Sequence, residues 1–236
     1  TGSGQVSLGD IQTEFGGSNP IGLSEYYGEG NAPGSGEIQL AADFYGTSSI
    51  TDAHTLIASA TISNDASITF SSGIDSTYDL YEFRFSIHPA SNATMFGWQA
   101  NAAGGSSFNE TITQGQFRSR KYEFGTHHGS ATDAKIEGEG TGYYNNETTY
   151  IRMNRSIGVD NDHSSAGTLH IYRPSNTASV TVYHSKVLSS NHDQAADIHY
   201  SHGYINNAAA IDEVDFKMEA GNLQTGTIKL YGLSLA

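Results

Sequence analysis

The stretch DLYEFRFSIH, residues 79–88, carries the clearest structural signal in this chain. Its residues alternate strictly between two sets. One set is entirely aromatic or aliphatic, and the other is mostly polar or charged. The first consists of Tyr81, Phe83, Phe85 and Ile87, and the second of Leu80, Glu82, Arg84 and Ser86. Because successive side chains of a strand point to opposite faces of a sheet, this alternation predicts a half-buried β-strand.

The same two-residue period recurs in several short stretches farther along the chain. They cover residues 95–100, 149–154, 169–172, 180–183, 214–218 and 228–231. Turn-forming residues separate them, as at Gly104-Gly105 and Pro174-Ser175-Asn176. No stretch after residue 50 alternates strands with amphipathic helices, which argues against a βαβ architecture. We therefore predict an all-β domain at residues 48–236, an antiparallel β-sandwich of jelly-roll-like type.

The composition limits the kinds of partner. The 236 residues carry a formal net charge of -14, with 11 Lys and Arg against 25 Asp and Glu. Nucleic-acid binding depends on Lys and Arg that neutralise phosphates, so we expect no nucleic-acid partner. No apolar run approaches the roughly 18–20 residues of a membrane span, and the N-terminal TGSGQVSLGD lacks the features of a secretory signal. The chain contains no Cys, which excludes disulfides and thiolate metal sites.

The first 47 residues differ from the rest because they contain a repeated phrase. Its copies are SGQVSLGDI at 3–11, NPIGLSEYYG at 19–28 and SGEIQLAADFYG at 35–46. Gly- and Pro-rich turns separate segments too short to form independent helices in water. We therefore predict an extended N-terminal arm, residues 1–47, with short helical turns that cannot bury their own apolar side chains.

Those apolar side chains are the candidate contacts of the arm. They are Ile11, Phe15, Leu23, Tyr26, Tyr27, Leu40, Phe44 and Tyr45. Large apolar groups left exposed on a surface mark interaction sites, which favours packing against a partner protein. The alternative is that the arm folds back onto its own β domain.

The N-terminal phrases resemble those of a family of tailed-bacteriophage virion proteins. The similar openings are residues 3–30 and 35–46. Three further stretches resemble a phage structural module, namely FSSGIDSTYDLYEFRFSIHP at 70–89, AGTLHIYRP at 166–174 and AIDEVDFKMEAGNLQTGTIKLYGL at 210–233. The closing GTIKLYG is the most specific of these pieces, and residues 105–165 match nothing in the family.

The resemblance implies a structural role in the virion, assembled in the host cytoplasm. The implied protein is a tail or fibre component, anchored by its N-terminal arm, with the β domain projecting outward. It would be a homo-oligomer, with a trimer as the form common among tail fibres, bound to other tail, neck or capsid proteins. The family implies no enzymatic activity and no cofactor. A capsid decoration protein and a module that binds surface polysaccharide are the alternatives.

Histidine and acidic clusters were considered as metal sites, and none is predicted. His199 and His202 stand three apart, so on a strand they would point to opposite faces and could not chelate one ion. The adjacent His127 and His128 present the same difficulty. The stretch DNDHS at 160–164 begins like a calcium loop, but Ser165 and Ile171 stand where that loop requires Gly and Glu. A turn between strands explains it better.

Catalytic motifs are also missing from the sequence, which contains no GK phosphate loop, HExxH or G-x-S-x-G. Sugar binding is the more plausible chemistry, because sugar sites often combine aromatic rings with polar neighbours. Tyr143 and Tyr144, followed by two Asn, are the candidate glycan-binding residues. Trp98 is a weaker candidate, since a single Trp on an alternating strand usually belongs to the core.

Overall fold

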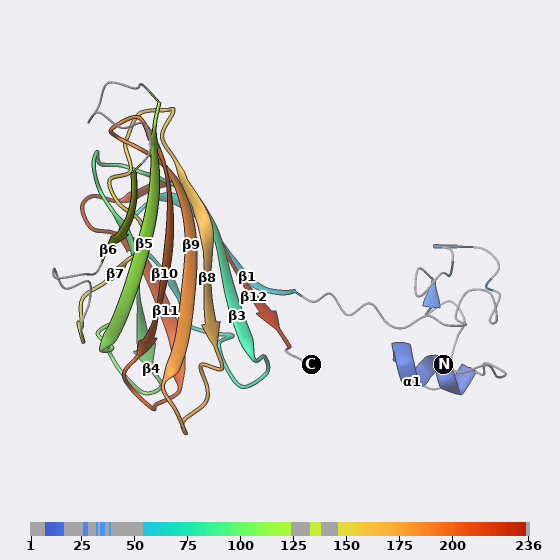
Figure 1. The fold of residues 1–236 in the computed structure, drawn as a ribbon. Helices are drawn as coiled ribbons and strands as arrows, with labels where there is room; N and C mark the ends of the chain where they lie inside the picture. The colour runs from blue at the N-terminus through green and yellow to red at the C-terminus, as the bar shows by residue number, and fades with distance from the viewer. Residues whose placement is uncertain are drawn as a thin grey trace. The chain divides into compact units, whose positions relative to one another are not determined.

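The computed structural model describes residues 8–16, 26–27, 32, 34–35, 38, 54–123, 133–137 and 146–234 (Figure 1). The chain divides into two compact units, Thr1–Ala53 and His54–Ala236. The sequence placed this division a few residues earlier, between residues 47 and 48. No helix among the described residues is long and apolar enough to cross a membrane.

The N-terminal unit contains one helix, α1 (Leu8–Phe15), which is longer than the single turn expected from the sequence. Gly16 ends it in the left-handed conformation, with φ of 80°, and its N–H donates to the carbonyl of Gln12 at 2.9 Å. Such a residue at the end of a helix satisfies a carbonyl that would lack an intrahelical partner. The Tyr26 hydroxyl donates to the Gly16 carbonyl at 3.0 Å, which links Tyr26 to the end of α1.

The second unit is built from two antiparallel sheets. The larger has the strand order β1-β12-β3-β8-β9-β10-β5-β6, and the smaller has the order β2-β11-β4-β7. In Figure 1, β5, β10, β9, β8 and β3 run side by side along the larger sheet. The strands are β1 (Thr55–Asp65), β2 (Ser67–Phe70), β3 (Leu80–Pro89), β4 (Phe96–Ala102), β5 (Ile112–Tyr122), β6 (Asp133–Glu137), β7 (Ile151–Arg152), β8 (Ser165–Tyr172), β9 (Thr181–Asn191), β10 (Ala195–Ile205), β11 (Ile211–Met218) and β12 (Leu223–Leu233).

The sheets enclose one apolar core, as the sequence predicts. The apolar set of β3 faces it and is buried, and the core also contains Ile228 and Leu230 of β12. Aromatic rings from both sheets meet there: Phe83 of β3 packs edge-on against Phe216 of β11, with ring centroids 5.1 Å apart. The predicted all-β class and antiparallel sandwich are therefore confirmed. Trp98 is fully buried and packs against Tyr183 of β9, so its core role is confirmed as well.

Two stretches depart from the simple alternation rule. Residues 149–154 form only the two-residue β7, because Asn154 replaces strand pairing with a side-chain contact: its Oδ1 accepts from the Phe96 N–H at 2.8 Å. Around residue 181, hydrophobicity alone would turn Val182 inward. Instead Thr181 and Tyr183 are buried and Val182 is half exposed.

Candidate functional site

The inner face of β5, β9 and β10 is polar although it is buried. On β5 the inward residues after Ile112 are two amides and two guanidinium groups, and β9 and β10 continue this pattern. These buried polar residues are Gln114, Gln116, Arg118, Arg120, Thr181, Ser185, Ser189, Asn191, Asp197, His199 and Ser201. Buried polar groups are costly unless they are hydrogen-bonded, so this arrangement requires an explanation.

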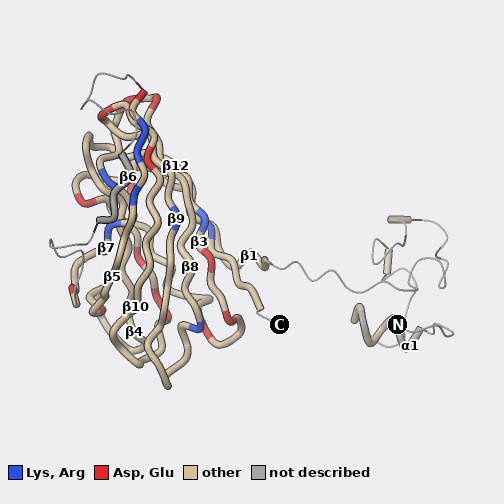
Figure 2. Tube along the Cα trace, viewed as in Figure 1, with Lys and Arg blue, Asp and Glu red and all other residues tan. Residues whose placement is uncertain are grey.

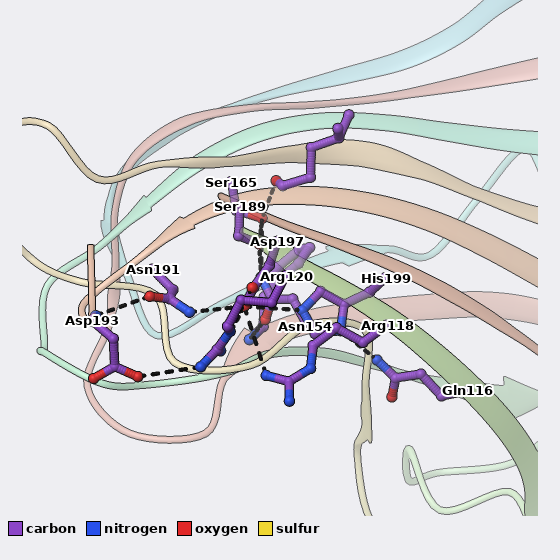
Figure 3. Close-up of polar contacts among 12 residues, drawn as sticks. Gln116, Arg118, Arg120, Asn154, Ser165, Ser189, Asn191, Asp193, Asp197 and His199 are labelled. Atoms are coloured by element: carbon purple, nitrogen blue, oxygen red, sulfur yellow. Dashed lines mark hydrogen bonds and ion pairs between the residues drawn. The ribbon is translucent and has the colours of Figure 1, made fainter. Parts of the chain in front are cut away.

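An ion pair between neighbouring strands organises this buried polar network (Figure 3). Arg120 of β5 lies opposite Asp197 of β10 in the sheet register. Its Nε donates to Asp197 Oδ1 and its Nη2 to Oδ2, both at 2.7 Å. Asn191 adds a third donor to Oδ2 at 2.8 Å, and Arg118 Nη1 lies 4.0 Å from the same oxygen. Two planar hydrogen bonds between ionised groups form the strongest kind of polar contact in a protein.

The surroundings of Asp197 keep it ionised. Burial by itself raises the pKa of this carboxyl, but the neighbouring His199 and the bonds from Arg120 and Asn191 outweigh burial and lower the pKa to about 2. A carboxylate with such a pKa cannot donate a proton near neutral pH. The network therefore suits a structural role and not general acid catalysis.

His199 extends the network toward the middle of the sheet. Gln116 Nε2 donates to His199 Nδ1 at 2.7 Å, and His199 Nε2 lies 3.7 Å from Asp197 Oδ2. Several polar atoms of this face are buried without a hydrogen-bond partner in the described part of the chain. They are Gln116 Oε1, His199 Nε2, Thr181 Oγ1, Ser185 Oγ and Ser201 Oγ.

Asn154 connects the network to the smaller sheet. Its Nδ2 donates to Ser165 Oγ of β8 at 3.0 Å, while its Oδ1 accepts from Phe96 of β4. Ser165 Oγ in turn donates to the Leu188 carbonyl of β9 at 3.1 Å. Figure 3 shows Asn154 and Ser165 near the ion pair. The polar contacts thus tie β4, β8 and β9 together behind the outer surface of the large sheet.

The outer face of the same three strands carries a group of exposed apolar side chains. We define the outer apolar face as five large side chains with exposed fractions between 37% and 50%. They are Phe117, Val180, Val182, Leu188 and Tyr204. Elsewhere in the described residues, only Tyr27 and Leu56 are exposed hydrophobic side chains of this size. Phe117 stacks on Tyr200 of β10, with ring centroids 4.8 Å apart and planes inclined by 16°.

The outer apolar face also lacks negative charge. The outward positions of β5, β9 and β10, all of them described, contain Lys121, Lys186, His184 and His202 but no Asp or Glu. Lys186 Nζ lies 5.8 Å from the centroid of the Tyr200 ring. In Figure 2 β9 and β10 are tan along most of their length. A surface without acidic groups is unusual in a chain with a net charge of -14.

A row of imidazoles crosses the outer apolar face, with Val182 and Tyr204 on one side of it and Phe117 and Leu188 on the other. Glu82, His170, His184 and His202 are successive register neighbours on β3, β8, β9 and β10. His170 and His184 stack with centroids 4.5 Å apart, and Glu82 Oε2 accepts from His54 at 3.0 Å. Burial lowers the pKa of His184, and the nearby His170 lowers it further. This row contains His202 but not His199, which is fully buried, so the prediction that these two point to opposite faces is confirmed.

The residues predicted to bind a partner are only partly described. Ile11 and Tyr26 are buried in a small cluster with Ala32, against which Phe15 and Ile38 pack. The expectation that these segments cannot bury their apolar side chains is therefore wrong for both residues, because α1 and the later segments of the unit cover one another. Tyr27 is 40% exposed, and its contact with a partner stays a prediction. The other candidates lie outside the described residues: Leu23, Leu40, Phe44, Tyr45, Tyr143, Tyr144, His127 and His128.

Sequence reasoning missed the outer apolar face. One signal could have found it: β9 and β10 contain a single acidic residue, Asp197, in a chain with 25 Asp and Glu. Hydrophobic alternation could not have found it, because the residues on both sides of these strands are of mixed polarity.

No protein-family model, curated protein or solved structure matches the chain.

Proposed function

We propose that this chain is a structural subunit of a phage virion, of tail or fibre type, and that its β domain self-associates through the outer apolar face. The observation that carries the proposal is the group of exposed apolar side chains on the outer side of β5, β9 and β10, strands whose inner side holds buried charged and polar groups. Exposed apolar side chains that are grouped on one surface mark a candidate subunit interface. The Arg120–Asp197 pair beneath them joins β5 to β10.

We also propose that the scaffold is a jelly roll, an architecture found in viral capsid and lectin domains. In a jelly roll of eight strands one sheet has the order first, eighth, third, sixth, and the other has second, seventh, fourth, fifth. The orders β1-β12-β3-β8 and β2-β11-β4-β7 support this assignment. The remaining strands extend the larger sheet in the order β9-β10-β5-β6. The outer apolar face and the buried polar network both lie on this extension.

Charge favours self-association at this face over other parts of the surface. Two copies that each carry a net charge of -14 repel one another wherever acidic surfaces meet. The outward positions of β5, β9 and β10 avoid that repulsion because they hold no Asp or Glu. Each large apolar side chain that becomes fully buried contributes about 1.5–3 kcal/mol before ordering costs. A homo-oligomer follows from this argument, and the resemblance to fibre proteins implies a trimer.

The N-terminal unit would attach the subunit to the particle. Its repeated phrase resembles the openings of phage virion proteins, and the repeats fall in a compact unit separate from the β unit. Of the paired Tyr26 and Tyr27, Tyr27 is the one exposed to a partner, since Tyr26 is buried. Neck, tail and capsid proteins are the partners that this proposal expects.

Crosslinking tests the proposed interface directly, because the natural chain contains no Cys. A single cysteine is introduced as Tyr204→Cys or Val182→Cys, and a bismaleimide is added to each purified full-length variant. We expect covalent dimers from both. Leu56→Cys is the matched control, since Leu56 is 53% exposed on β1, at the opposite end of the larger sheet. Equal crosslinking of Leu56→Cys and Tyr204→Cys would contradict the interface.

Purified phage particles test the virion assignment. Quantitative mass spectrometry should detect the chain at a fixed copy number, and immunogold labelling should place it on the tail. A copy number on the order of hundreds would favour the capsid decoration alternative. Absence of the chain from intact particles would overturn the proposal.

A further inference from the structure

The loop between β7 and β8 brings together three side chains that can bind a metal ion. One oxygen from each of Asp160 and Asp162 and one ring nitrogen of His163 lie within 4.8 Å of one another. Asp160 Oδ2 is 4.0 Å from His163 Nδ1, and Asp162 Oδ1 is 3.9 Å from His163 Nε2. Both distances are too long for a hydrogen bond.

His163 supplies an independent indication of a missing ligand. Its side chain is only 4% exposed, and its Nδ1 has no hydrogen-bond partner within the described ranges of the chain. Gly158 makes room for the ring, because a Cβ at that position would lie 1.9 Å from Nδ1. A buried ring nitrogen without a partner is unfavourable, and an ion bound between Nδ1 and Asp160 would supply that partner.

We propose that Asp160, Asp162 and His163 bind a divalent transition-metal ion, with Zn²⁺ as the preferred ion. A Zn²⁺ ion lies about 2.0–2.2 Å from imidazole nitrogen and carboxylate oxygen. It therefore fits between His163 Nδ1 and Asp160 Oδ2, which are 4.0 Å apart. The two carboxylates are 77% and 74% exposed, which lets them rotate onto the ion and leaves a path for it to enter. Water completes the coordination.

The surrounding structure holds this loop in place. The His163 N–H donates to the Asp160 carbonyl at 2.9 Å, and His88 Nε2 of β3 lies 3.1 Å from the same oxygen. At the start of the loop, the Ile157 N–H donates to the Thr94 carbonyl at 2.8 Å. The ligands therefore sit on a turn anchored at both ends, which reduces the ordering cost of binding.

The ligand set selects the class of ion. Imidazole suits zinc and other transition metals, whereas Ca²⁺ requires six to eight oxygen ligands. For mixed nitrogen and oxygen sites the affinity for Zn²⁺ exceeds that for Mn²⁺. The sequence of this loop does not fit a calcium-binding loop, because Ser165 and Ile171 stand where Gly and Glu are required. The buried His163 offers a nitrogen ligand instead, which suits a transition metal.

Calorimetric titration of the untagged full-length chain with Zn²⁺, Mn²⁺ and Ca²⁺ tests the proposal. We expect one site that binds Zn²⁺ most tightly and is weakened at least about tenfold, or lost, in His163→Ala. His202→Ala is the matched control, because His202 is exposed on β10, and it should retain the site. Zinc should also raise the melting temperature of the wild type and of His202→Ala, but not of His163→Ala.

If His163→Ala fails to fold, the double variant Asp160→Asn, Asp162→Asn provides a second test. Both carboxylates are exposed, so their replacement should not disturb folding. The double variant should lose the same site. Zinc binding unchanged in the double variant would overturn the proposal. So would tighter binding of Ca²⁺ than of Zn²⁺, or the absence of a zinc site in the wild type.

Discussion

The Arg120 guanidinium donates two hydrogen bonds, each 2.7 Å long, to the Asp197 carboxylate on the adjacent strand of the large sheet. Their backbones are register partners, so the pair fixes β5 against β10. The pair lies on the inner face of these strands, and Phe117 and Tyr204 lie on the outer one. We infer that the buried charges keep this part of the large sheet rigid. Its outer side then remains available for an apolar interface.

Asp197→Asn should destabilise the β unit by about 3–5 kcal/mol, because the substitution leaves the Arg120 guanidinium buried without its counter-charge. The free energy of unfolding in urea measures this. Asp193→Asn is the matched control: Asp193 lies 3.4 Å from Arg120 but is 45% exposed, so its loss should cost less than about 1 kcal/mol. Equal effects of the two substitutions would refute a central role for the Asp197 pair.

The same pair should make stability depend on pH in acid. The pKa of Asp197 is about 2 in the folded chain, below the ordinary value of 3.8. The folded state therefore keeps this group ionised at pH values where the unfolded chain takes up a proton. Its contribution is full above pH 3.8 and is lost as the pH falls toward 2, by on the order of 2 kcal/mol.

Urea unfolding of the wild type and of Asp197→Asn at a series of pH values between 5 and 2 measures this contribution. The gap in unfolding free energy between the two proteins should narrow by about 2 kcal/mol on acidification. A gap that stays constant down to pH 2 would mean that Asp197 does not titrate as its surroundings require.

Gly226→Ala should destabilise the sheet by at least about 2 kcal/mol. Gly226 of β12 has φ of 137°, and a Cβ there would lie 2.1 Å from the Ser86 carbonyl oxygen of β3. Gly104→Ala is the control, since Gly104 also has positive φ, at 80°, but no atom within 4 Å of the added Cβ. Its cost should be limited to backbone strain of about 1–2 kcal/mol. Thermal unfolding compares them, and similar shifts would show that the contact with β3 is unimportant.

The sequence predicts the fold where strands follow the alternation rule. β3 places Tyr81, Phe83, Phe85 and Ile87 in the core as expected, because apolar burial dominates the orientation of that strand. Glu82 is also buried, since His54, His170 and Arg84 surround it. That contact joins residues far apart in the chain, and a local pattern cannot reveal it.

The candidate site was harder to predict because several of its charged residues are buried while several of its apolar residues are exposed. Asp197, His199 and Arg120 lie inside, and Val182 and Leu188 lie outside. This orientation depends on pairing between strands that are distant in sequence, and each strand alone is ambiguous. The sequence names Ile11 and Tyr26 as contacts with a partner but does not predict their burial within the N-terminal unit, because the residues that cover them are distant in the chain.

Sedimentation equilibrium of the full-length chain tests self-association through the outer apolar face most directly. The wild type should have the mass of an oligomer, three times the 25.2 kDa of one chain if it is a trimer. Phe117→Lys combined with Leu188→Lys should sediment as a folded monomer, whereas Leu56→Lys should remain an oligomer. A monomeric wild type, or a double variant that associates as tightly as the wild type, would contradict the account.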